Sequence, residues 1–496
     1  MKKTSKHPQW ALAQKKPGTE LRCIRGKYYL YECSSFYDKE SKRTRKKTGK
    51  YLGMVTEEKG LVPPRRRQIA IDNETACAEA VAGEIRAPQP KVGQVKEYGL
   101  SAFILGQCQE LTENLKSAMP RLWNRIMAMA YCRLRCQSPL KRISDDFSDS
   151  YLSQSLGEEG LSARTLTDFL KELGKNRDGI LAFMRKYAGA GGNIIFDGTD
   201  ILSSSAKMDF PRMSKTKLGG FAEAVKLMMA FSTQHTLPVY YRLLPGNIKD
   251  ITSFLASLDE LGDMSARVVC DKGFFSKKNI EELDRRSVNY IIALRRSTEG
   301  LDYEKFGSHS SDGHFFYAGR LIKYCTQTTL NHTTYVFFDA KHAAEEETDY
   351  LRRVDDEKYE NYTMETYTAK APQFGTLAVI VSDEIAANVA YEIYKSRCEV
   401  EQEIDVLKTD LDALTSYMQD NDRLEGWMFV NFIALHIFYT IRRRIVDNNL
   451  SQTLSTRDAI RVLCRQRIVR LDREWKLAEA SSKDKAQLNA LGVPIT

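Results

Sequence analysis

The chain has 496 residues and a formal net charge of +9 at pH 7, with 42% hydrophobic and 28% charged residues. Its length allows about two to four units with separate hydrophobic cores. The composition is that of a soluble globular protein and excludes an intrinsically disordered chain.

The N-terminus and the cysteines bear on the cellular compartment. The first residues, MKKTSKHPQWALAQKK, contain no apolar core, so we expect no secretory signal peptide. The ten cysteines form no CxxC pair, and Cys132 and Cys136 have no histidine partners nearby in the sequence. This pattern predicts free thiols and no zinc site. Free thiols are typical of a reducing cytoplasm, where we expect the protein to lie.

The N-terminal region is predicted to be rich in β-structure and basic. Two β-type segments, Leu21–Cys33 and Lys46–Met54, flank the run KESKRTRKKTGK, which has seven Lys or Arg residues and one acid. This order predicts a hairpin with a positively charged tip. Further basic clusters are Arg65–Arg67, Arg442–Arg444 and Arg461–Arg473. Each alone fits a solvated surface, but together they indicate an extended polyanion as partner.

Residues 100–187 have a helical pattern. Within it, Leu161–Gly174 has Ser162 as the expected N-cap and apolar residues at helical spacing. Such a short capped helix, with Arg164 and Thr165 exposed in its first turn, fits a DNA groove. It fits a helix of a bundle equally well, and the sequence leaves both interpretations open.

The pattern changes to short apolar strands at residue 193. Two of these strands, Asn193–Asp197 and Arg267–Asp271, are predicted to end on an aspartate. Three consecutive strands followed by alternating helix and strand predict a mixed α/β sheet. A polar, β-leaning segment, Arg295–Gln373, is then inserted. The apolar stretch Trp427–Ile441 has 15 residues, too few to span a bilayer comfortably, and predicts a buried helix.

The stretch Tyr391–Asp412 has no proline or glycine and predicts one helix. Glu399 and Glu403 are expected to point away from the polar face that borders its apolar stripe, and to be solvated. At about 100° per residue, four residues share that polar face: Tyr394, Arg397, Glu401 and Lys408.

Asp197, Asp271 and Glu401 supply three carboxylates that can converge on one site. Their charges repel unless they are neutralised, and oxygen ligands of this kind suit Mg²⁺ or Mn²⁺. Two such ions about 3.5–4 Å apart can activate an attacking oxygen and stabilise the leaving oxygen of a phosphodiester. Asp200 is a rival for the first position, but it is expected to lie beyond the strand end. An aspartate at a strand end also fits a backbone cap.

These residues resemble a known family. The run from Tyr394 to Lys408 reads Y, two residues, R, three residues, E, six residues, K, similar to the Y-R-E-K signature of DDE transposases in the insertion-sequence-four superfamily. FDGTD around Asp197 resembles the first-acid region of that family, and CDKGF around Asp271 resembles the second. PGNIKD resembles an element between the two. The resemblance covers roughly residues 193–439.

The resemblance implies a ribonuclease H-like fold: an α/β mixed sheet flanked by helices, with a β-rich insertion before the last acid. It implies Asp197, Asp271 and Glu401 as catalytic ligands of two Mg²⁺ or Mn²⁺ ions. Residues expected to contact DNA are Tyr394, Arg397, Lys408 and Lys272 near the metals, and Arg43, Arg45, Lys46 and Lys47 in the hairpin.

The activity implied is DNA transposition by an insertion sequence. Water attacks at the element end, and the freed 3′-hydroxyl then attacks target DNA. The implied partners are double-stranded DNA, as terminal inverted repeats and target, and a second copy of the chain in a synaptic homodimer. No membrane partner is expected, and the implied location is a prokaryotic cytoplasm. Some relatives stack a flipped base on a Trp of the insertion, which has none here. The aromatic residues left for that role are Phe315, Phe316, Tyr317 and Tyr335.

Two other functions remain open. One is a DNA-binding protein descended from a transposase that no longer cuts, although all three acids are present. The other is a different nuclease of ribonuclease H-like fold, such as a resolvase. The expected organisation is a β-rich basic unit and linker (1–92), a helical region (93–190), the first part of the catalytic core (191–294), the insertion (295–373), the second part of the core (374–450) and a basic helical tail (451–496).

Overall fold

The computed structural model describes most of the chain as two compact units, residues 1–90 and 91–496. Each unit is considered by itself. The described residues are 7–38, 43–64, 92–188 and 191–495, except 204, 206, 216–220, 249, 263–264, 308–309, 330, 357–358, 414 and 417.

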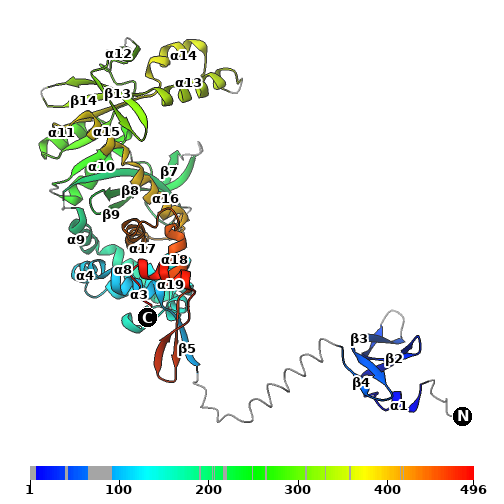
Figure 1. Cartoon of the computed structure of the whole chain (residues 1–496). Helices are drawn as coiled ribbons and strands as arrows, with labels where there is room; N and C mark the ends of the chain where they lie inside the picture. Colours follow the sequence, from blue (N-terminus) through cyan, green and yellow to red (C-terminus); the bar gives the residue numbers. More distant parts are fainter. Residues whose placement is uncertain are drawn as a thin grey trace. The chain divides into compact units, whose positions relative to one another are not determined.

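The N-terminal unit is a small antiparallel sheet (Figure 1). The predicted strand Leu21–Cys33 is in fact two strands, because Arg25 and Gly26 both have positive φ and form a tight turn. The predicted hairpin is confirmed, since β2 and β3 pair with each other. Its basic run is not a loop as predicted, because residues 43–50 belong to β3, while residues 39–42 lie outside the described part of the chain. The elements are α1 (Gln9–Leu12), β1 (Thr19–Ile24), β2 (Lys27–Asp38), β3 (Arg43–Thr56) and β4 (Gly60–Val62).

The larger unit begins with a helical bundle. One bundle helix, α8 (Ala163–Lys175), starts at Ser162, whose side chain accepts from the Thr165 N–H as predicted. Its apolar face packs against the long helix α17 (Asn421–Asp447). The segment is therefore a bundle helix, and its predicted contact with DNA stays a prediction. The other helices are α3 (Gly99–Gln107), α4 (Gln109–Ala118), α5 (Trp123–Cys136), α6 (Ile143–Ser148), α7 (Leu152–Leu156) and α9 (Arg177–Ala188).

The contact between α8 and α17 depends on two glycines. A Cβ on Gly174 would lie 1.7 Å from the Asp422 carbonyl oxygen, and one on Gly426 would lie 2.2 Å from that of Leu170. Both distances are far shorter than a van der Waals contact, so only glycine allows the two backbones to approach this closely.

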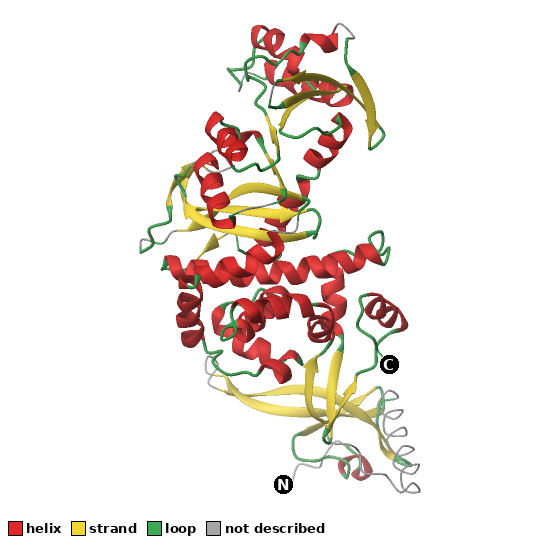
Figure 2. Cartoon of the chain, turned by 90° about the vertical axis from the view of Figure 1, so that its left-hand side faces the viewer, coloured by secondary structure: helices red, strands yellow, loops and turns green. Residues whose placement is uncertain are grey.

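Helix α17 is the long helix between the sheet and the bundle in Figure 2. By length and composition alone it could cross a membrane, yet 89% of its most apolar window is buried inside the protein. The prediction of a buried helix at Trp427–Ile441 is therefore confirmed.

A mixed sheet forms the centre of the larger unit. Its middle strands follow the order β9-β8-β6-β10-β11. β6, β8 and β9 are antiparallel neighbours, whereas β10 runs parallel to β6 and β11 parallel to β10. This is the ribonuclease H-like arrangement, so the predicted fold class is confirmed. The elements are β6 (Asn193–Ser203), β7 (Arg212–Lys215), β8 (Phe221–Ser232), β9 (Leu237–Pro245), α10 (Asp250–Leu261), β10 (Arg267–Cys270), α11 (Lys277–Arg285) and β11 (Tyr290–Ala293).

The inserted segment extends this sheet in the order β12-β13-β14-β15-β11. It is less β-rich than predicted, because the sequence after Asp339 is rich in the helix formers Ala and Glu and Asp339 caps its first turn. The elements are α12 (Glu304–Gly307), β12 (Gly313–Tyr317), β13 (Arg320–Thr328), β14 (Thr333–Asp339), α13 (Ala340–Val354), α14 (Met364–Lys370) and the returning strand β15 (Thr376–Val381).

The C-terminal segment is not entirely helical as predicted. β17 and β18 form a hairpin whose two-residue turn, Asp472–Arg473, has Asp472 at φ 55°. This hairpin pairs with β5, the first strand of the larger unit, so the two ends of the unit share a three-stranded sheet. The elements are β5 (Val92–Glu97), α18 (Thr456–Arg465), β17 (Arg467–Leu471), β18 (Glu474–Leu477) and α19 (Ser482–Ala490).

Helix α17 carries a buried histidine that is surrounded by aromatic rings. His436 is 1% exposed, and its ring centroid lies 4.9 Å from that of Tyr187 and 5.0 Å from that of Phe432. Burial lowers the pKa of His436 to about 3, although a hydrogen bond to the Pro238 backbone opposes the shift. The imidazole is therefore neutral in the folded chain near pH 7.

Acid is expected to destabilise the larger unit through His436. The unfolded chain takes up this proton near pH 6.5 and the folded chain only near pH 3, so the free energy of unfolding falls as the pH falls through that range. One pKa unit corresponds to about 1.4 kcal/mol, which gives a loss of about 2 kcal/mol between about pH 7 and pH 5.

Urea denaturation at both pH values measures this loss. His436→Phe should make it smaller, because the phenyl ring takes no proton. The control is His342→Phe, at a half-exposed histidine on α13. If wild type and His436→Phe lose the same stability, His436 does not carry the effect.

Candidate active site

Two aspartates lie side by side on the central sheet. β6 and β10 pair in parallel with Cys270 opposite Phe196; Asp197 is the next residue of β6, and Asp271 directly follows the end of β10. Neighbouring strands are about 4.8 Å apart, and residues in register point to the same face. Burial and then the negative charges of Asp197 and Asp271 raise the pKa of the Cys270 thiol well above its usual value. Both acids therefore lie near Cys270, and their convergence on one metal site stays a prediction.

The first of these acids lies within a strand and not at its end. β6 continues past Asp197 to Ser203, because it pairs with β8 as far as Leu202. Strand alternation puts Asp197 and Asp200 on opposite faces of the sheet. Asp200 instead lies 3.9 Å from Lys226, its register partner on β8. Asp200 is thus separated from Asp271 by this alternation, and not by the strand end that the sequence predicted.

The predicted helix Tyr391–Asp412 is two helices, α15 (Ala387–Lys395) and α16 (Cys398–Thr409). The Ser396 hydroxyl donates to the Ile393 carbonyl at 2.6 Å, a local bond that competes with the helix ladder. The break places Tyr394 in the last turn of α15 and Arg397 at the N-cap of α16.

Tyr394 connects α15 to the second acid. Its hydroxyl donates to Oδ1 of Asp271 at 3.3 Å. Burial and then the negative charge of Asp271 raise the pKa of Tyr394 above its usual value. The phenol therefore remains protonated and donates a hydrogen bond to the carboxylate.

Arg397 is the cation that faces all three acids. Its Nη2 lies 2.9 Å from Oε1 of Glu401, one helical turn further on. Partial burial lowers the pKa of Arg397, but the phenol of Tyr394 and the acids Asp271, Glu401 and Asp197 raise it, and the net change is upward. The guanidinium thus offsets the repulsion between these carboxylates.

Lys408 joins the end of α16 to β6. Its Nζ donates to Oγ1 of Thr199, which lies on the same face of the strand as Asp197. In the signature, Tyr394 thus contacts Asp271, Arg397 contacts Glu401, and Lys408 contacts β6.

The donor set fits a hard divalent cation only in part. The site offers carboxylate oxygens, which Mg²⁺ and Mn²⁺ prefer, and two of them are adjacent. Glu401 is 51% exposed in its side chain and is paired with Arg397. Among the described residues, no three of His, Cys, Asp and Glu are close enough together to hold a metal ion.

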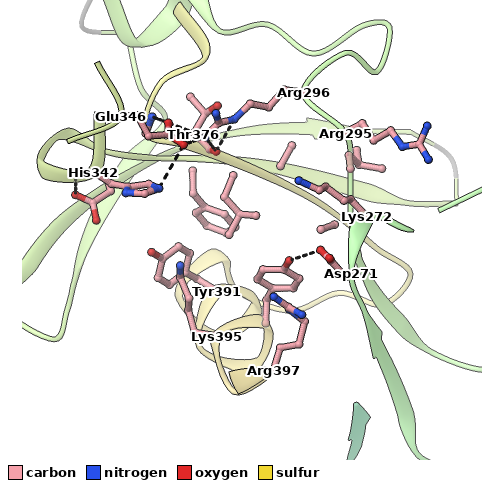
Figure 3. A pocket seen from close by; sticks show the side chains of 18 of the residues that line it. Asp271, Lys272, Arg295, Arg296, His342, Glu346, Thr376, Tyr391, Lys395 and Arg397 are labelled. Carbon is pink, nitrogen blue, oxygen red and sulfur yellow. Dashed lines mark hydrogen bonds and ion pairs between the residues drawn. The ribbon is translucent and has the colours of Figure 1, made fainter. Parts of the chain in front are cut away.

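A pocket of about 880 Å³ opens beside Asp271, between the core and the insertion (Figure 3). Lys272, which the sequence predicted as a phosphate contact, lines it next to Asp271. The wall also includes cations that the sequence did not single out: Arg295, Arg296, Arg320 and Lys395. The sequence contained a signal for Arg295 and Arg296, because they come one residue after the end of β11, the strand parallel to β10.

Two of these cations are already paired. Arg296 lies 2.9 Å from Glu346, and Arg320 lies 3.0 Å from Asp339. Lys395 lies 5.1 Å from the ring centroid of Tyr391, and burial lowers its pKa. Arg295 is exposed at the pocket rim.

Most candidate stacking residues of the insertion are used in packing. Phe315 and Tyr317 lie 5.4 Å and 5.2 Å, between ring centroids, from Tyr391. Tyr335 is 9% exposed, whereas Phe316 is 72% exposed on β12. Phe316 alone of these residues presents its ring to solvent.

The expectation that Glu399 and Glu403 are solvated is wrong. The side of α16 that carries them is covered by α17, where Arg442 lies 3.2 Å from Glu399. Glu403 is 0% exposed, and neither carboxylate oxygen has a hydrogen-bond partner. Burial raises the pKa of Glu403 well above its usual value. The helical wheel separated these acids from Glu401 correctly but could not show that a second helix covers them.

The remaining predicted DNA contacts belong to the N-terminal unit. Arg43, Arg45, Lys46 and Lys47 all lie on β3, where their side chains are exposed.

Comparisons with known proteins gave one family-model match and a distant structural similarity. Residues 191–437, from the start of β6 into α17, match the family model described as "Transposase DDE domain". No curated protein matches the chain. A solved structure, "Cryo-EM structure of piggyBac transposase synaptic complex with hairpin DNA (SNHP)", is similar with 11% sequence identity and a TM-score of 0.39, covering 74% of this chain and 79% of the other.

Glu403→Leu is expected to raise the free energy of unfolding. The substitution removes a buried carboxyl group without hydrogen bonds and keeps a side chain of similar size. We expect the free energy of unfolding to rise by about 1–3 kcal/mol. Urea denaturation measures the change. The control, Glu399→Leu, breaks the ion pair with Arg442 and should lower stability. A fall in stability for Glu403→Leu would show that the carboxyl has a favourable partner in solution.

Proposed function

We propose that the chain is a DNA transposase of an insertion sequence, which cuts DNA at the ends of the element and joins them to target DNA. One observation carries the proposal: Arg397 interacts with Asp197 on β6, with Asp271 just after the neighbouring parallel strand β10 and with Glu401, in a region that matches a transposase DDE domain.

Asp197, Asp271 and Glu401 are proposed to hold two Mg²⁺ or Mn²⁺ ions. When bound, such ions activate the attacking oxygen and stabilise the leaving oxygen of a phosphodiester. Asp197 and Asp271 are held by adjacent backbone segments, so their separation is set by the sheet. Glu401, exposed at the rim beside Arg397, supplies the third carboxylate from a helix.

The surrounding side chains are proposed to orient the DNA strand. Tyr394 fixes one oxygen of Asp271 by its hydrogen bond and leaves the other free to bind. Arg397 and Lys408 provide a planar fork and a point charge for phosphate oxygens. Lys272 lies in the same pocket as Arg397 and is suited to the adjacent phosphate.

The partners are double-stranded DNA, as terminal inverted repeats and as target, and a second copy of the chain, since two ends must be brought together. The basic N-terminal unit is proposed as a further DNA contact, and the cytoplasm as the location. The helical region and the insertion are proposed to support the two halves of the catalytic core.

Two other functions differ in what they predict. A DNA-binding protein that no longer cuts would bind the element ends without cleaving them. A ribonuclease H-like nuclease or resolvase would cleave without joining. A strand-transfer assay with Mg²⁺ and duplexes that carry the ends of the element distinguishes all three.

Glu401→Gln is expected to lower cleavage of the element ends by at least about 10³-fold, because an amide is a poor replacement for a carboxylate ligand. DNA binding should remain close to that of the wild type. The assay is cleavage of a labelled end duplex in Mg²⁺, with a gel-shift measurement of binding.

The matched control is Glu403→Gln, the same substitution two residues further on and on the side of α16 that faces α17. It should cleave like the wild type. Cleavage by Glu401→Gln at the wild-type rate, or loss of cleavage in both variants, would show that Glu401 is not the third acid.

A further inference from the structure

The β2–β3 hairpin extends well beyond the small sheet to which it belongs. β1 pairs with β2 only as far as Glu32, and β4 pairs with β3 only from Met54 to Thr56. Beyond these points β2 and β3 pair with each other, from Cys33 opposite Thr48 to Asp38 opposite Arg43, and the Cys33 N–H also donates to the Gly18 carbonyl. We call this two-stranded ribbon, residues 33–38 and 43–48, the arm.

The dimensions of the arm match a DNA groove. At about 3.4 Å per residue, six residues of each strand span about 20 Å, and the two strands are about 5 Å apart. A two-stranded ribbon with its side chains fits the major groove of B-DNA, which is about 12 Å wide, and is too wide for the minor groove, which is about 6 Å wide.

The two faces of the arm differ in chemistry. In register, Phe36 is opposite Arg45 and Ser34 is opposite Lys47. Strand alternation adds Arg43, which is opposite Asp38 in register. This face therefore has register positions for three cations and one acid beside a phenyl ring that is 51% exposed. We call it the Arg45 face.

The other face, the Lys46 face, is less basic. Lys46 is opposite Ser35, and Thr48 is opposite Cys33. The Thr48 hydroxyl accepts a hydrogen bond from Arg22. The pKa of Glu20 is lowered mainly by a hydrogen bond from Arg22, against the effect of burial, and the positive charge of Lys46 lowers it further. This face thus continues into a network within the sheet.

We propose that the arm enters the major groove of duplex DNA with its Arg45 face toward the base edges. Arginine and lysine donate to O6 and N7 of guanine, and a phenyl ring packs on thymine methyl groups. The arm has four cations in its sequence and one acid, Asp38. The excess of positive charge complements the phosphate walls of the groove. This inference rests on the proposed function, since the DNA that it names is the end of the element.

The experiment uses the full chain and two duplex probes, one with the terminal sequence of the element and one of unrelated sequence. Lys47→Ala and Lys46→Ala form a matched pair, because they make the same change in neighbouring residues on opposite faces. Lys47→Ala and Arg45→Ala should weaken binding to the end probe about 5- to 100-fold. Lys46→Ala should weaken it less than about threefold, with a small change in salt dependence.

Phe36→Ser should weaken binding to the end probe and leave the salt dependence unchanged, because it removes no charge. Methylation with dimethyl sulfate identifies the groove, since guanine N7 lies in the major groove and adenine N3 in the minor groove. Guanine methylation should block binding of the wild type at positions where Arg45→Ala is insensitive to it.

The two proposals can fail separately. If the wild type cleaves the end probe while Lys47→Ala, Arg45→Ala and Phe36→Ser bind like the wild type, the arm proposal is overturned and the function stands. Equal losses in Lys46→Ala and Lys47→Ala on both probes, without guanine interference, also overturn it: the cations then only contact phosphates or keep the exposed strand edges from aggregating. Guanine interference with a wild type that never cleaves would support the arm and overturn the catalytic function.

Discussion

The parallel pairing of β6 with β10 is the constraint on which the proposed site depends. It puts Asp197 on one strand and Asp271 directly after the end of its neighbour, in a sheet whose strands are about 4.8 Å apart, so the charges of the two acids repel. The surrounding residues reduce this cost, since Tyr394 donates to Asp271 and Arg397 acts on both acids. A divalent cation would reduce it further, which is why the same geometry favours metal-dependent chemistry on phosphodiesters.

Helix α17 determines how the third acid is presented. It packs against α8 and α5 in the bundle and against α16 on its other side. The buried Arg133 of α5 donates to the Asn431 side chain on α17 and to the Leu411 carbonyl just after α16. Because α17 covers the side of α16 with Glu399 and Glu403, Glu401 is left on the open side. The helix that carries Glu401 is thus in contact with the helical bundle.

Much of the predicted site follows from local sequence, and most of the errors in the prediction come from contacts between distant segments. The Y-R-E-K spacing and the two aspartates predict residues of which the structure joins Tyr394 to Asp271 and Arg397 to Glu401. Asp197 was placed at a strand end because a polar residue follows three apolar ones, but pairing with β8 carries the strand on to Ser203. The absence of proline and glycine predicts one helix over Tyr391–Asp412. The structure has two helices there, separated at Ser396, whose hydroxyl donates to the Ile393 carbonyl. The pocket cations could not be predicted together, because Arg295 and Arg320 line one pocket only when the insertion extends the sheet.

The sequence by itself determined the types of residue in the site, the mixed α/β class and the basic hairpin, because these depend on periodicity and on spacing along one strand or helix. The tertiary structure decided which residues are neighbours across elements. The register of β6 with β10 is set by long-range hydrogen bonds, and the burial of Glu403 is set by a helix that starts 18 residues later at Asn421. The two faces of the β2–β3 arm likewise depend on cross-strand register, which a single strand does not specify.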